Sequence, residues 1–505
     1  MELPGVACRG SDLSVPLRNC GDTNGVAAFF ISNYGAYIMH ASIVTDLGFG
    51  DAGKGTMVDY LARQTSQAVI VRFNGGAQAA HNVHTACGKH HTFSQFGSGM
   101  LVPGTRTFLS HYVLFDPFAL RNEADALSKL VPGDPLSRVI VDGGALTVTP
   151  FQKAANRVRE SLRGAGRHGS VGMGIGETMA DMLTFPELAV YAHDLRDLPL
   201  LFQKLKRQQE LKQAEFGERL AVVSESGVLP EEVRLLSDPN APRYIAETMV
   251  ELSRRFTLGS MSILKRLSYE HPLIFEGAQG ILIDEWHGFH PYTTWSTSTN
   301  KNANALLRDL GYLGPVNRYG VVRAYSTRHG PGPFPSEDQG LTMALPDTHN
   351  VFGRWQGGFR VGWLDLPLTR YALAVSEGTD TILLTHLDRW AQLGEKKVVT
   401  AYAVEASALS TRERAAIVEM KVARPVAGKV YIGSFRPKET LEDLTYQEML
   451  GDILGKSEPV FEYTELSGEA YADFVGTRLG LPVGVTSYGR TAAEKRERLS
   501  LLQAA

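Results

Sequence analysis

Residues 44–59 read VTDLGFGDAGKGTMVD, and this stretch decides how the rest of the chain is interpreted. An apolar run typical of a buried strand, ASIV, leads into a glycine-rich loop, and a segment of helical character leaves it. The loop nearly fits the phosphate-loop pattern G-x-x-x-x-G-K-[ST], but Gly55 stands where the magnesium-binding hydroxyl belongs. The loop also contains a carboxylate, Asp51, although a negative charge is unexpected in a loop suited to phosphates.

The glycine loop is interpreted as an anion site. Its backbone N–H groups and the N-terminus of the following helix would hold an anion, and Lys54 adds a point charge. A tight glycine turn without a ligand is the alternative. The lysine and the strand–loop–helix order favour phosphate binding over that alternative.

The composition is that of an ordinary globular protein. Of 505 residues, 43% are apolar and 21% are charged, and the net charge of −3 gives no reason to expect nucleic acid or an anionic membrane as a partner. Polar residues interrupt every long apolar run, so no membrane span is predicted. The three cysteines, Cys8, Cys20 and Cys87, lack C-x-x-C spacing. Such sparse cysteines favour a reducing compartment, the cytoplasm, over a disulfide or zinc framework.

Residues 1–38 are expected to lie outside the main domain, which would span 39–505. The stretch 25–45 has no charged side chain and could be taken for a signal sequence. However, Glu2 and Asp12 precede it, no basic start region is present, and the run leads straight into the glycine loop. We interpret 1–38 as an extension, disordered or not, or as a misassigned start.

From Ser42 onward, short β-type runs alternate with helical segments, which indicates a mostly parallel sheet flanked by helices. We therefore predict an α/β fold with a large central sheet. The strand candidates are ASIVT, AVIVRF, RVIVD, PLIFEG, YGVVRAY and DTILLTHL. Residues 191–268 are expected to form a helical excursion, and 391–480 a mixed C-terminal portion. Ligands of open α/β sheets bind beyond the carboxyl ends of the strands, so the loops after these runs should carry the chemistry.

Six further segments carry loops of this kind. They are RFNGGAQAAHNVH (72–84), GSVGMGIGETMAD (169–181), FEGAQGILIDEWHG (275–288), TRHGPGPFPSE (327–337), FRVGWLD (359–365) and ILLTHLDRW (382–390). In this order, and together with DLGFGDAGKGT, they resemble the motifs of the adenylosuccinate synthetase family, whose enzymes join aspartate to IMP using GTP. The likeness runs collinearly from Ser42 to about Thr491. The chain is identified as a member of this family, with the adenylosuccinate synthetase fold and a phosphate-loop-like nucleotide site.

The resemblance also explains the carboxylate in the glycine loop. In the family this residue takes the N1 proton of IMP and helps to bind Mg²⁺, and Asp51 matches it. The purine O6 then attacks the γ-phosphate of GTP and gives 6-phosphoryl-IMP, while a histidine matched by His81 stabilises the transferring group. Finally the amine of aspartate displaces phosphate at C6. The resemblance therefore implies a Mg²⁺-dependent ligase of de novo AMP biosynthesis.

Other ligand contacts are implied one position at a time. For the triphosphate they are Gly50, Gly53, Lys54 and Gly55 of the glycine loop, Arg360, and Asp388, whose carboxylate would read the guanine N1 and N2 hydrogens. For the monophosphate they are Gln78, Gln279 and Thr294. Magnesium would be bound by Asp51 and by the carbonyl of Ala80, which stands where the family has glycine. Arg354, together with Arg360, remains from the loop that holds aspartate.

Departures from the family pattern lie in the regions that select substrates. In the glycine loop, Ala52 and Thr56 replace a glutamate and a lysine. In the third loop, Val171 and Met173 replace a hydroxyl and a positive charge that face the nucleotide phosphate in the family. The loss of these groups makes the chain a divergent member.

The aspartate and base regions also differ. The aspartate loop reads RWQGGFR and has lost arginines, although a dicarboxylate needs bidentate guanidinium partners. His386 replaces a lysine that packs on guanine, and the terminal G-P-D-R is shortened to Y-G-R, ending at Arg490. The amino donor and the choice between GTP and ATP are therefore left open.

Three alternatives to a synthetase acting on IMP follow. The nearest is a phage-type relative that makes 2-aminoadenylosuccinate from dGMP, although the retained Asp51 counts against it. The others are a non-catalytic nucleotide-binding homologue and a generic phosphate-loop NTPase. The expected partners are small molecules: a purine nucleoside monophosphate, a nucleoside triphosphate and aspartate. A homodimer is also expected, because the family completes its active site with an arginine from the partner subunit.

Overall fold

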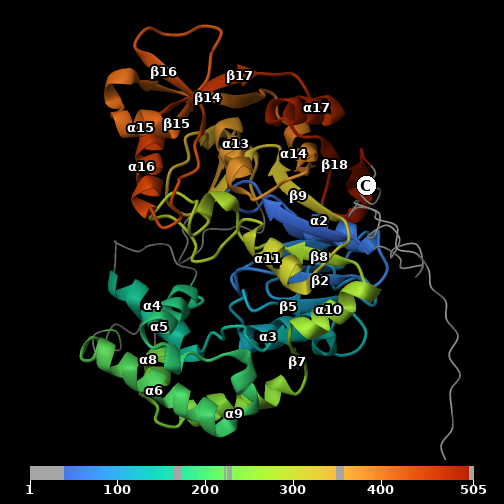
Figure 1. Cartoon of the computed structure of the whole chain (residues 1–505), viewed down its shortest axis with the longest axis vertical. Helices are drawn as coiled ribbons and strands as arrows, with labels where there is room; N and C mark the ends of the chain where they lie inside the picture. Colours follow the sequence, from blue (N-terminus) through green and yellow to red (C-terminus); the bar gives the residue numbers. More distant parts are fainter. Residues whose placement is uncertain (1–38, 164–171, 221–222, 224–229, 348–357, 500–505) are drawn as a thin grey trace, which may run out of the picture. The chain divides into compact units, whose positions relative to one another are not determined.

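A ten-stranded sheet forms the centre of the computed structural model, which describes residues 39–163, 172–220, 223, 230–347 and 358–499. Its strands follow the order β19 (Lys495–Glu497), β18 (Val483–Ser487), β13 (Thr381–Thr385), β9 (Val316–Arg323), β1 (Ala41–Asp46), β8 (Leu273–Glu276), β2 (Val69–Arg72), β5 (Arg106–Leu109), β6 (Val139–Asp142) and β7 (Thr257–Gly259). All neighbours in this sheet are parallel except β18 and β19 (Figure 1). The predicted fold class and the six predicted strands are confirmed.

Alternating side chains explain why helices cover both faces of this sheet. Ile43 and Phe275 point to one face, where they pack with α10 (Met261–Glu270) and α11 (Lys301–Leu310). Their neighbours Val44 and Ile274 point to the other face and pack with α2 (Lys54–Arg63). Each buried aliphatic side chain contributes roughly 1.5–3 kcal/mol, so strands that are apolar on both faces require both helical layers.

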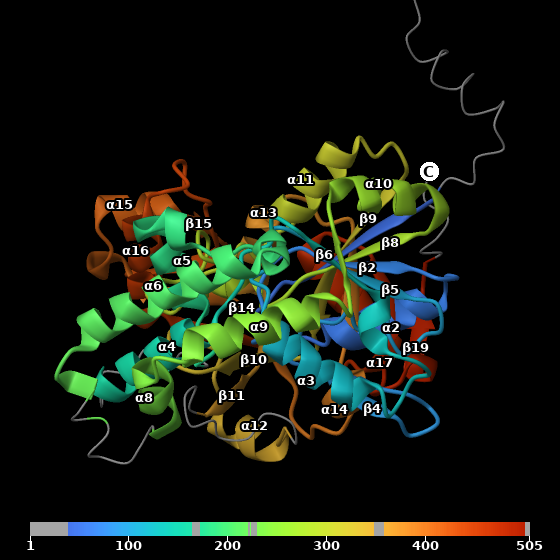
Figure 2. The same cartoon turned by 90° about the horizontal axis from the view of Figure 1, so that it is seen from below.

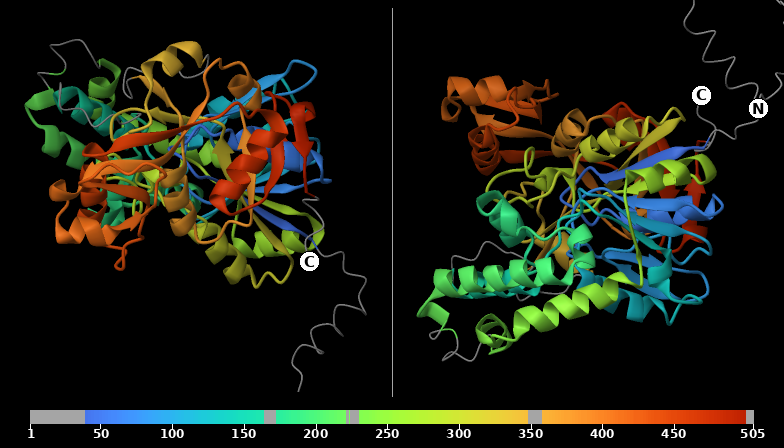
Figure 3. Two further views of the ribbon diagram at one scale, coloured as in Figure 1. Left: turned by 90° about the horizontal axis from the view of Figure 1, so that it is seen from above. Right: turned by 60° about the horizontal axis from the view of Figure 1, so that its bottom comes forward.

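A second core holds the helices that follow β6. They are α4 (Pro150–Arg163), α6 (Leu198–Phe216), α8 (Pro230–Ser237) and α9 (Ala241–Ser253), joined by α3 (Pro117–Leu127), which precedes β6. The helix α5 (Ile175–Thr184) packs against α4. The long helices α6 and α9 run side by side (Figure 3). The range 191–268 thus contains several helices, and it also contributes β7 to the edge of the sheet.

The C-terminal portion builds a separate five-stranded sheet (Figure 2). It contains β12 (Leu364–Asp365), β14 (Lys397–Glu405), β15 (Ile417–Glu419), β16 (Lys429–Phe435) and β17 (Glu458–Tyr463). The helices of this portion and of the segment before it are α12 (Gln339–Ala344), α13 (Leu366–Val375), α15 (Thr411–Ala416), α16 (Leu444–Gly455) and α17 (Gly468–Leu479). The buried Asp365 joins this sheet to α13, since it accepts hydrogen bonds from Leu368 N (3.1 Å) and from the Tyr402 hydroxyl (2.5 Å).

Two short hairpins and a helical turn complete the fold. The hairpins pair β3 (His81–His84) with β4 (His90–Phe93), and β10 (Ser326–His329) with β11 (Phe359–Gly362), while α14 (Leu387–Ala391) follows β13. Within the described ranges, no helix is both long and apolar enough to cross a membrane. The boundary expected at Met39 stays a prediction, because residues 1–38 lie outside the described part of the chain.

Candidate active site

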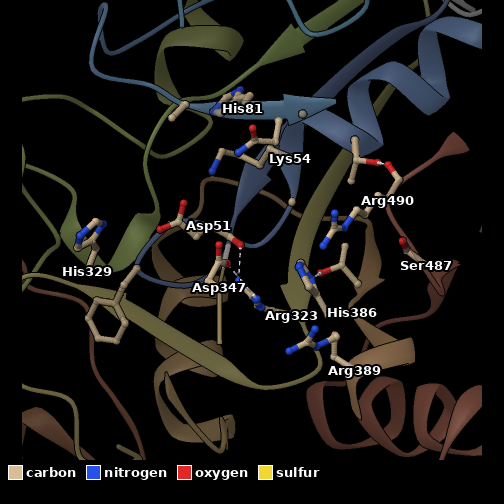
Figure 4. A pocket seen from close by; sticks show the side chains of 18 of the residues that line it. Asp51, Lys54, His81, Arg323, His329, Asp347, His386, Arg389, Ser487 and Arg490 are labelled. Carbon is tan, nitrogen blue, oxygen red and sulfur yellow. Dashed lines mark hydrogen bonds and ion pairs between the residues drawn. The ribbon is translucent and has the colours of Figure 1, made fainter. Parts of the chain in front are cut away.

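A cavity of about 330 Å³ lies beyond the carboxyl ends of the central strands. The loops after β1, β2, β8, β9, β13 and β18 all contribute to its walls, as expected for an open α/β sheet (Figure 4). Of the residues predicted from the sequence to act in catalysis or to bind ligands, ten line this cavity. They are Gly50, Asp51, Gly53, Lys54, Gly55, Gln78, Ala80, His81, Gln279 and Asp388.

The glycine loop is held by a buried carboxylate, Asp46, at the end of β1. Its oxygens accept hydrogen bonds from the backbone N–H groups of Gly48 and Ala52, each at 2.9 Å. The Lys54 ammonium lies 3.0 Å from Asp46 Oδ2 and donates to the carbonyl of Gln279 at 2.6 Å. The charge of Lys54 is therefore largely neutralised by Asp46, a partner that the sequence analysis missed because it lies on the preceding strand.

The loop residue Asp51 has an uncommon backbone conformation, with φ of 61°. Burial raises the pKa of its carboxyl group, while the nearby charges of Lys54 and Arg323 act in the opposite direction. A desolvated carboxylate facing a cavity is suited to receive a proton or a cation.

His81 is oriented by a second buried carboxylate. Its Nδ1 lies 2.6 Å from Glu276 Oε1, and Glu276 also accepts hydrogen bonds from the backbone N–H of Ser98 (2.8 Å) and from the Ser98 hydroxyl. Burial alone would raise the pKa of Glu276, but the charge of Arg72 and the hydrogen bonds from His81 and Ser98 lower this pKa to about 2.

The protonation of His81 follows from its partner. Burial lowers the pKa of His81, so the imidazole is neutral near pH 7. Because the ionised Glu276 can only accept hydrogen bonds, the proton of the neutral ring resides on Nδ1. Nε2 is left with a lone pair.

A close approach of two loops fixes Gln279. The glycine after it, Gly280, lies so close to the main chain of Gly48 and Gly50 that a Cβ would overlap both. Gln279 itself adopts a positive φ of 65°, and its carbonyl accepts a hydrogen bond from Lys54. The FEGAQG segment thus packs directly against the glycine loop, although the two segments are far apart in the sequence.

One end of the cavity is formed by β13, α14 and the C-terminal strand pair. Asp388 lies there with His386, Ser487 and Arg490. His386 Nδ1 is 2.8 Å from the hydroxyl of Thr385, and burial, reinforced by nearby cations, lowers the pKa of His386 well below its usual value. A neutral imidazole therefore stands where the family has a lysine.

Residues at this end of the cavity are hydrogen-bonded to the glycine loop and to the helix that follows it. Thr56, which stands where the family has a second lysine, donates from its hydroxyl to the carbonyl of Arg490 at 3.0 Å. The Thr385 hydroxyl donates to the carbonyl of Ala52 at 2.7 Å. Two of the positions that depart from the family pattern thus contact the segments that form the far wall.

Arg323, at the end of β9, also lines the cavity, and the sequence analysis did not single it out. Its Nη1 donates to the carbonyl of Asp51 (3.0 Å) and its Nη2 to the Tyr325 hydroxyl (2.7 Å). The signal that could have found it is its position: it lies near the end of the predicted strand YGVVRAY, and the carboxyl ends of such strands face the ligand site.

Two predicted residues that the structure describes, Thr294 and Arg360, do not line this cavity. Thr294 lies on the loop that follows Gln279, where its N–H donates to the carbonyl of Ile283 at 2.8 Å. Arg360 pairs with Glu337 (2.8 Å) and donates to the carbonyl of Gly330 at 2.6 Å. Arg354 lies outside the described residues, as does Val171.

Gln78 lines the cavity with an amide whose polar atoms are both buried and lack a hydrogen-bond partner among the described residues. An unpartnered buried amide costs about 1–3 kcal/mol, which a polar ligand group would recover. Its position therefore fits the monophosphate contact expected from the sequence.

A magnesium site of the expected kind is compatible with these residues. The described residues contain no cluster of three acidic, histidine or cysteine side chains that could cage a metal ion. Mg²⁺ does not need such a cage, since it usually takes one or two carboxylates and completes its coordination with substrate phosphates and water. Asp51 supplies a desolvated carboxylate, and Ala80, exposed at the cavity, supplies a backbone carbonyl.

The fold and site define an α/β protein with a phosphate-loop-like turn beyond the ends of its central strands. Residues 43–431 match the family model described as Adenylosuccinate synthetase, and the chain belongs to the adenylosuccinate synthetase family, whose members are ligases. The synthetase of Chlorobium chlorochromatii is 30% identical over 470 residues, which cover 89% of this chain and 95% of that protein. The synthetase of Cyanothece sp. is 34% identical over 372 residues, covering 72% and 78%.

Two solved structures share the fold. Fully ligated adenylosuccinate synthetase from Plasmodium falciparum superposes with a TM-score of 0.68 at 19% identity, covering 91% of this chain and 100% of that one. The cyanophage S-2L succinoaminodeoxyadenylate synthetase, bound to dGMP and to dATP as an energy donor, gives a TM-score of 0.53 at 15% identity, covering 92% and 96%.

Proposed function

We propose that this protein is a Mg²⁺-dependent purine nucleotide ligase that converts IMP, L-aspartate and GTP into adenylosuccinate, GDP and phosphate. The observation that carries the proposal is one cavity lined by Asp51, Lys54 and His81, with the His81 ring held from behind by the buried Glu276. These groups are what the first half of the reaction requires: a base, a phosphate-loop cation and an oriented imidazole.

The proposed reaction has two steps. Asp51 accepts the N1 proton of IMP, the O6 forms a bond to the γ-phosphorus of GTP, and the bond to the β-phosphate oxygen breaks with release of GDP. His81 is held at Nδ1 by Glu276, and its Nε2 takes up a proton from solvent when the anionic substrates bind. The resulting Nε2–H donates a hydrogen bond to an oxygen of the transferring phosphoryl group. The amine of aspartate then bonds to C6, phosphate leaves, and the amine loses a proton.

Magnesium, when bound, would neutralise charge on the phosphates; Asp51 and the Ala80 carbonyl are the residues proposed to hold it. The base of the triphosphate is proposed to lie against Asp388. A carboxylate accepts hydrogen bonds from N1–H and N2–H of guanine, whereas adenine presents an acceptor at N1, so the retained Asp388 favours GTP over ATP.

The test is phosphate release combined with product mass, for the purified protein with Mg²⁺. The assay crosses GTP or ATP with IMP or dGMP, each with and without aspartate. The proposal expects release that needs IMP and aspartate and gives a product with the mass of adenylosuccinate. Activity with dGMP in place of IMP would instead support a 2-aminoadenylosuccinate synthetase, and release without a purine monophosphate would overturn both.

Variants assign the activity to this site. Asp51→Ala should abolish turnover, whereas Asp473→Asn, which changes an exposed carboxylate on α17, should not. Full turnover by Asp51→Ala would contradict the proposed base. Light scattering of the same samples tests the homodimer proposed from family membership.

A further inference from the structure

Arg323 is a buried cation on the wall of the cavity. Only 8% of its surface is exposed, and two good hydrogen bonds tie it to the Asp51 carbonyl and the Tyr325 hydroxyl. The carboxylate of Asp347 is more distant, with 3.8 Å between Oδ2 and Nη2. Figure 4 shows the guanidinium between Asp51, Asp347 and His386.

The Arg323 guanidinium has N–H donors that its hydrogen bonds to Asp51 and Tyr325 leave unused. Arginine carries five N–H donors, and the bonds to Asp51 and Tyr325 use two of them. Nε is buried and has no hydrogen-bond partner within the described ranges. A buried donor without an acceptor is costly, so this arrangement is suited to a ligand that supplies oxygen acceptors.

The protein groups of the neighbouring loop carry little net positive charge of their own. The glycine loop and the strand before it carry two carboxylates, Asp46 and Asp51, and one ammonium group, Lys54, which is paired with Asp46. This loop therefore lacks the net positive charge expected of a site for a highly anionic phosphate chain. Arg323 lies beside it and supplies one positive charge from a different strand.

The side chain is also pre-organised. Its guanidinium carbon lies 4.5 Å from the centroid of the Tyr325 ring, a cation–π arrangement that fixes the plane of the group. A planar guanidinium held in one orientation loses little conformational entropy on binding phosphate oxygens, unlike a flexible lysine.

We propose that Arg323 binds the phosphate chain of the nucleoside triphosphate and at the same time holds the backbone of Asp51 in its left-handed conformation. The identity of the ligand rests on the proposed function. The role of Arg323 does not depend on the amino donor or on the monophosphate, because it concerns the triphosphate alone.

The experiment measures the Kd of GTP and of ATP, each with Mg²⁺ and without monophosphate or aspartate, by isothermal titration calorimetry. Arg323→Met should weaken binding of the preferred triphosphate by roughly 10- to 100-fold, as expected for loss of a charge-assisted contact. Arg323→Lys keeps the charge but cannot serve Asp51, Tyr325 and phosphate together, so it should recover only part of this loss.

Arg370 offers a matched control. It is an arginine on α13 that donates to the backbone carbonyls of Thr400 and Gly433 and does not line the cavity. Arg370→Met should lower the melting temperature yet keep the triphosphate Kd within about twofold, since the contacts it removes lie outside the cavity. A comparable loss of affinity in Arg370→Met would mean that general destabilisation explains the Arg323 result, and would overturn the inference.

The outcomes separate this inference from the proposed function. If the wild-type protein binds neither triphosphate, the proposed function fails. If the wild type binds and Arg323→Met binds equally well, only the role of Arg323 fails. Should Arg323→Met not fold, Arg323→Lys and Tyr325→Phe decide the question: unchanged affinity in both would overturn the inference, and weakened affinity in both would support it.

Discussion

His81 Nδ1 and Glu276 Oε1 lie 2.6 Å apart, and the carboxylate is in turn anchored by the N–H and hydroxyl groups of Ser98. The pair joins the start of β3, which follows β2 in the chain, to the end of β8. The strands β2 and β8 are neighbours in the central sheet. Glu276 thereby fixes both the orientation and the tautomer of the imidazole, as a carboxylate does in other acid–base pairs.

Replacing Glu276 by Gln should therefore impair catalysis more than binding. The amide nearly preserves the shape of the side chain but loses the charge that stabilises a protonated His81, so kcat should fall by about 10- to 100-fold with little change in KM. Steady-state phosphate release checks this. A variant with normal kcat and a raised KM would show that the pair serves substrate binding instead.

Substitutions of Asp46 and Lys54 should have strongly non-additive effects on the free energy of unfolding. Leaving either charge buried without its partner costs about 3–5 kcal/mol, so Asp46→Asn and Lys54→Met should each lower the free energy of unfolding markedly. The double variant buries no unpaired charge and should be less destabilised than the sum of the single variants. Urea unfolding of all four proteins measures the coupling, and additive effects would contradict the pairing.

Gly280 should not tolerate even a methyl group. A Cβ there would overlap the main chain of Gly48 and Gly50, so Gly280→Ala should separate the two loops and abolish triphosphate binding. Gly394→Ala is the control, because no atom lies within 4 Å of a Cβ at that position. Calorimetric titration with GTP checks both variants. Unimpaired binding by Gly280→Ala would refute the close approach.

Asp365 should give the protein an unusual dependence of stability on pH. Burial raises the pKa of this carboxyl to about 6, above the 3.8 of an exposed aspartate, so the folded protein favours the protonated form. Its contribution to stability is complete below pH 3.8 and is lost as the pH rises to about 6, by roughly 3 kcal/mol in total.

Asp365→Asn removes this titration while keeping a residue that can cap α13. Its free energy of unfolding should therefore improve relative to the parent protein as the pH rises from 4 to 7. Urea unfolding at several pH values measures the difference. A constant difference would show that Asp365 does not titrate in this range.

The fold was predictable where strands are long, apolar and followed by distinctive loops. ASIVT and PLIFEG were recognised as strands because every residue suits a buried sheet. The order of strands was not predictable, since β8 lies between β1 and β2 only after a long excursion in the chain. Pairing of this kind depends on tertiary packing, which leaves no local signal.

The candidate site was predictable to a similar degree. Asp51, His81 and Gln279 belong to contiguous motifs, and all three line the cavity. Asp46 and Arg323 escaped notice because each looks like an ordinary residue of its strand. Their roles arise from partners supplied by other segments, the N–H of Ala52 and the carbonyl of Asp51.

The place of β1 between β8 and β9 has a consequence for biosynthesis. At roughly 5–20 residues per second, a ribosome needs on the order of 10 to 50 seconds after making β1 before β8 emerges. During that time an entirely buried strand has neither of its neighbours, and such an edge invites aggregation. The central sheet therefore cannot be completed around β1 until the chain has been translated as far as β9.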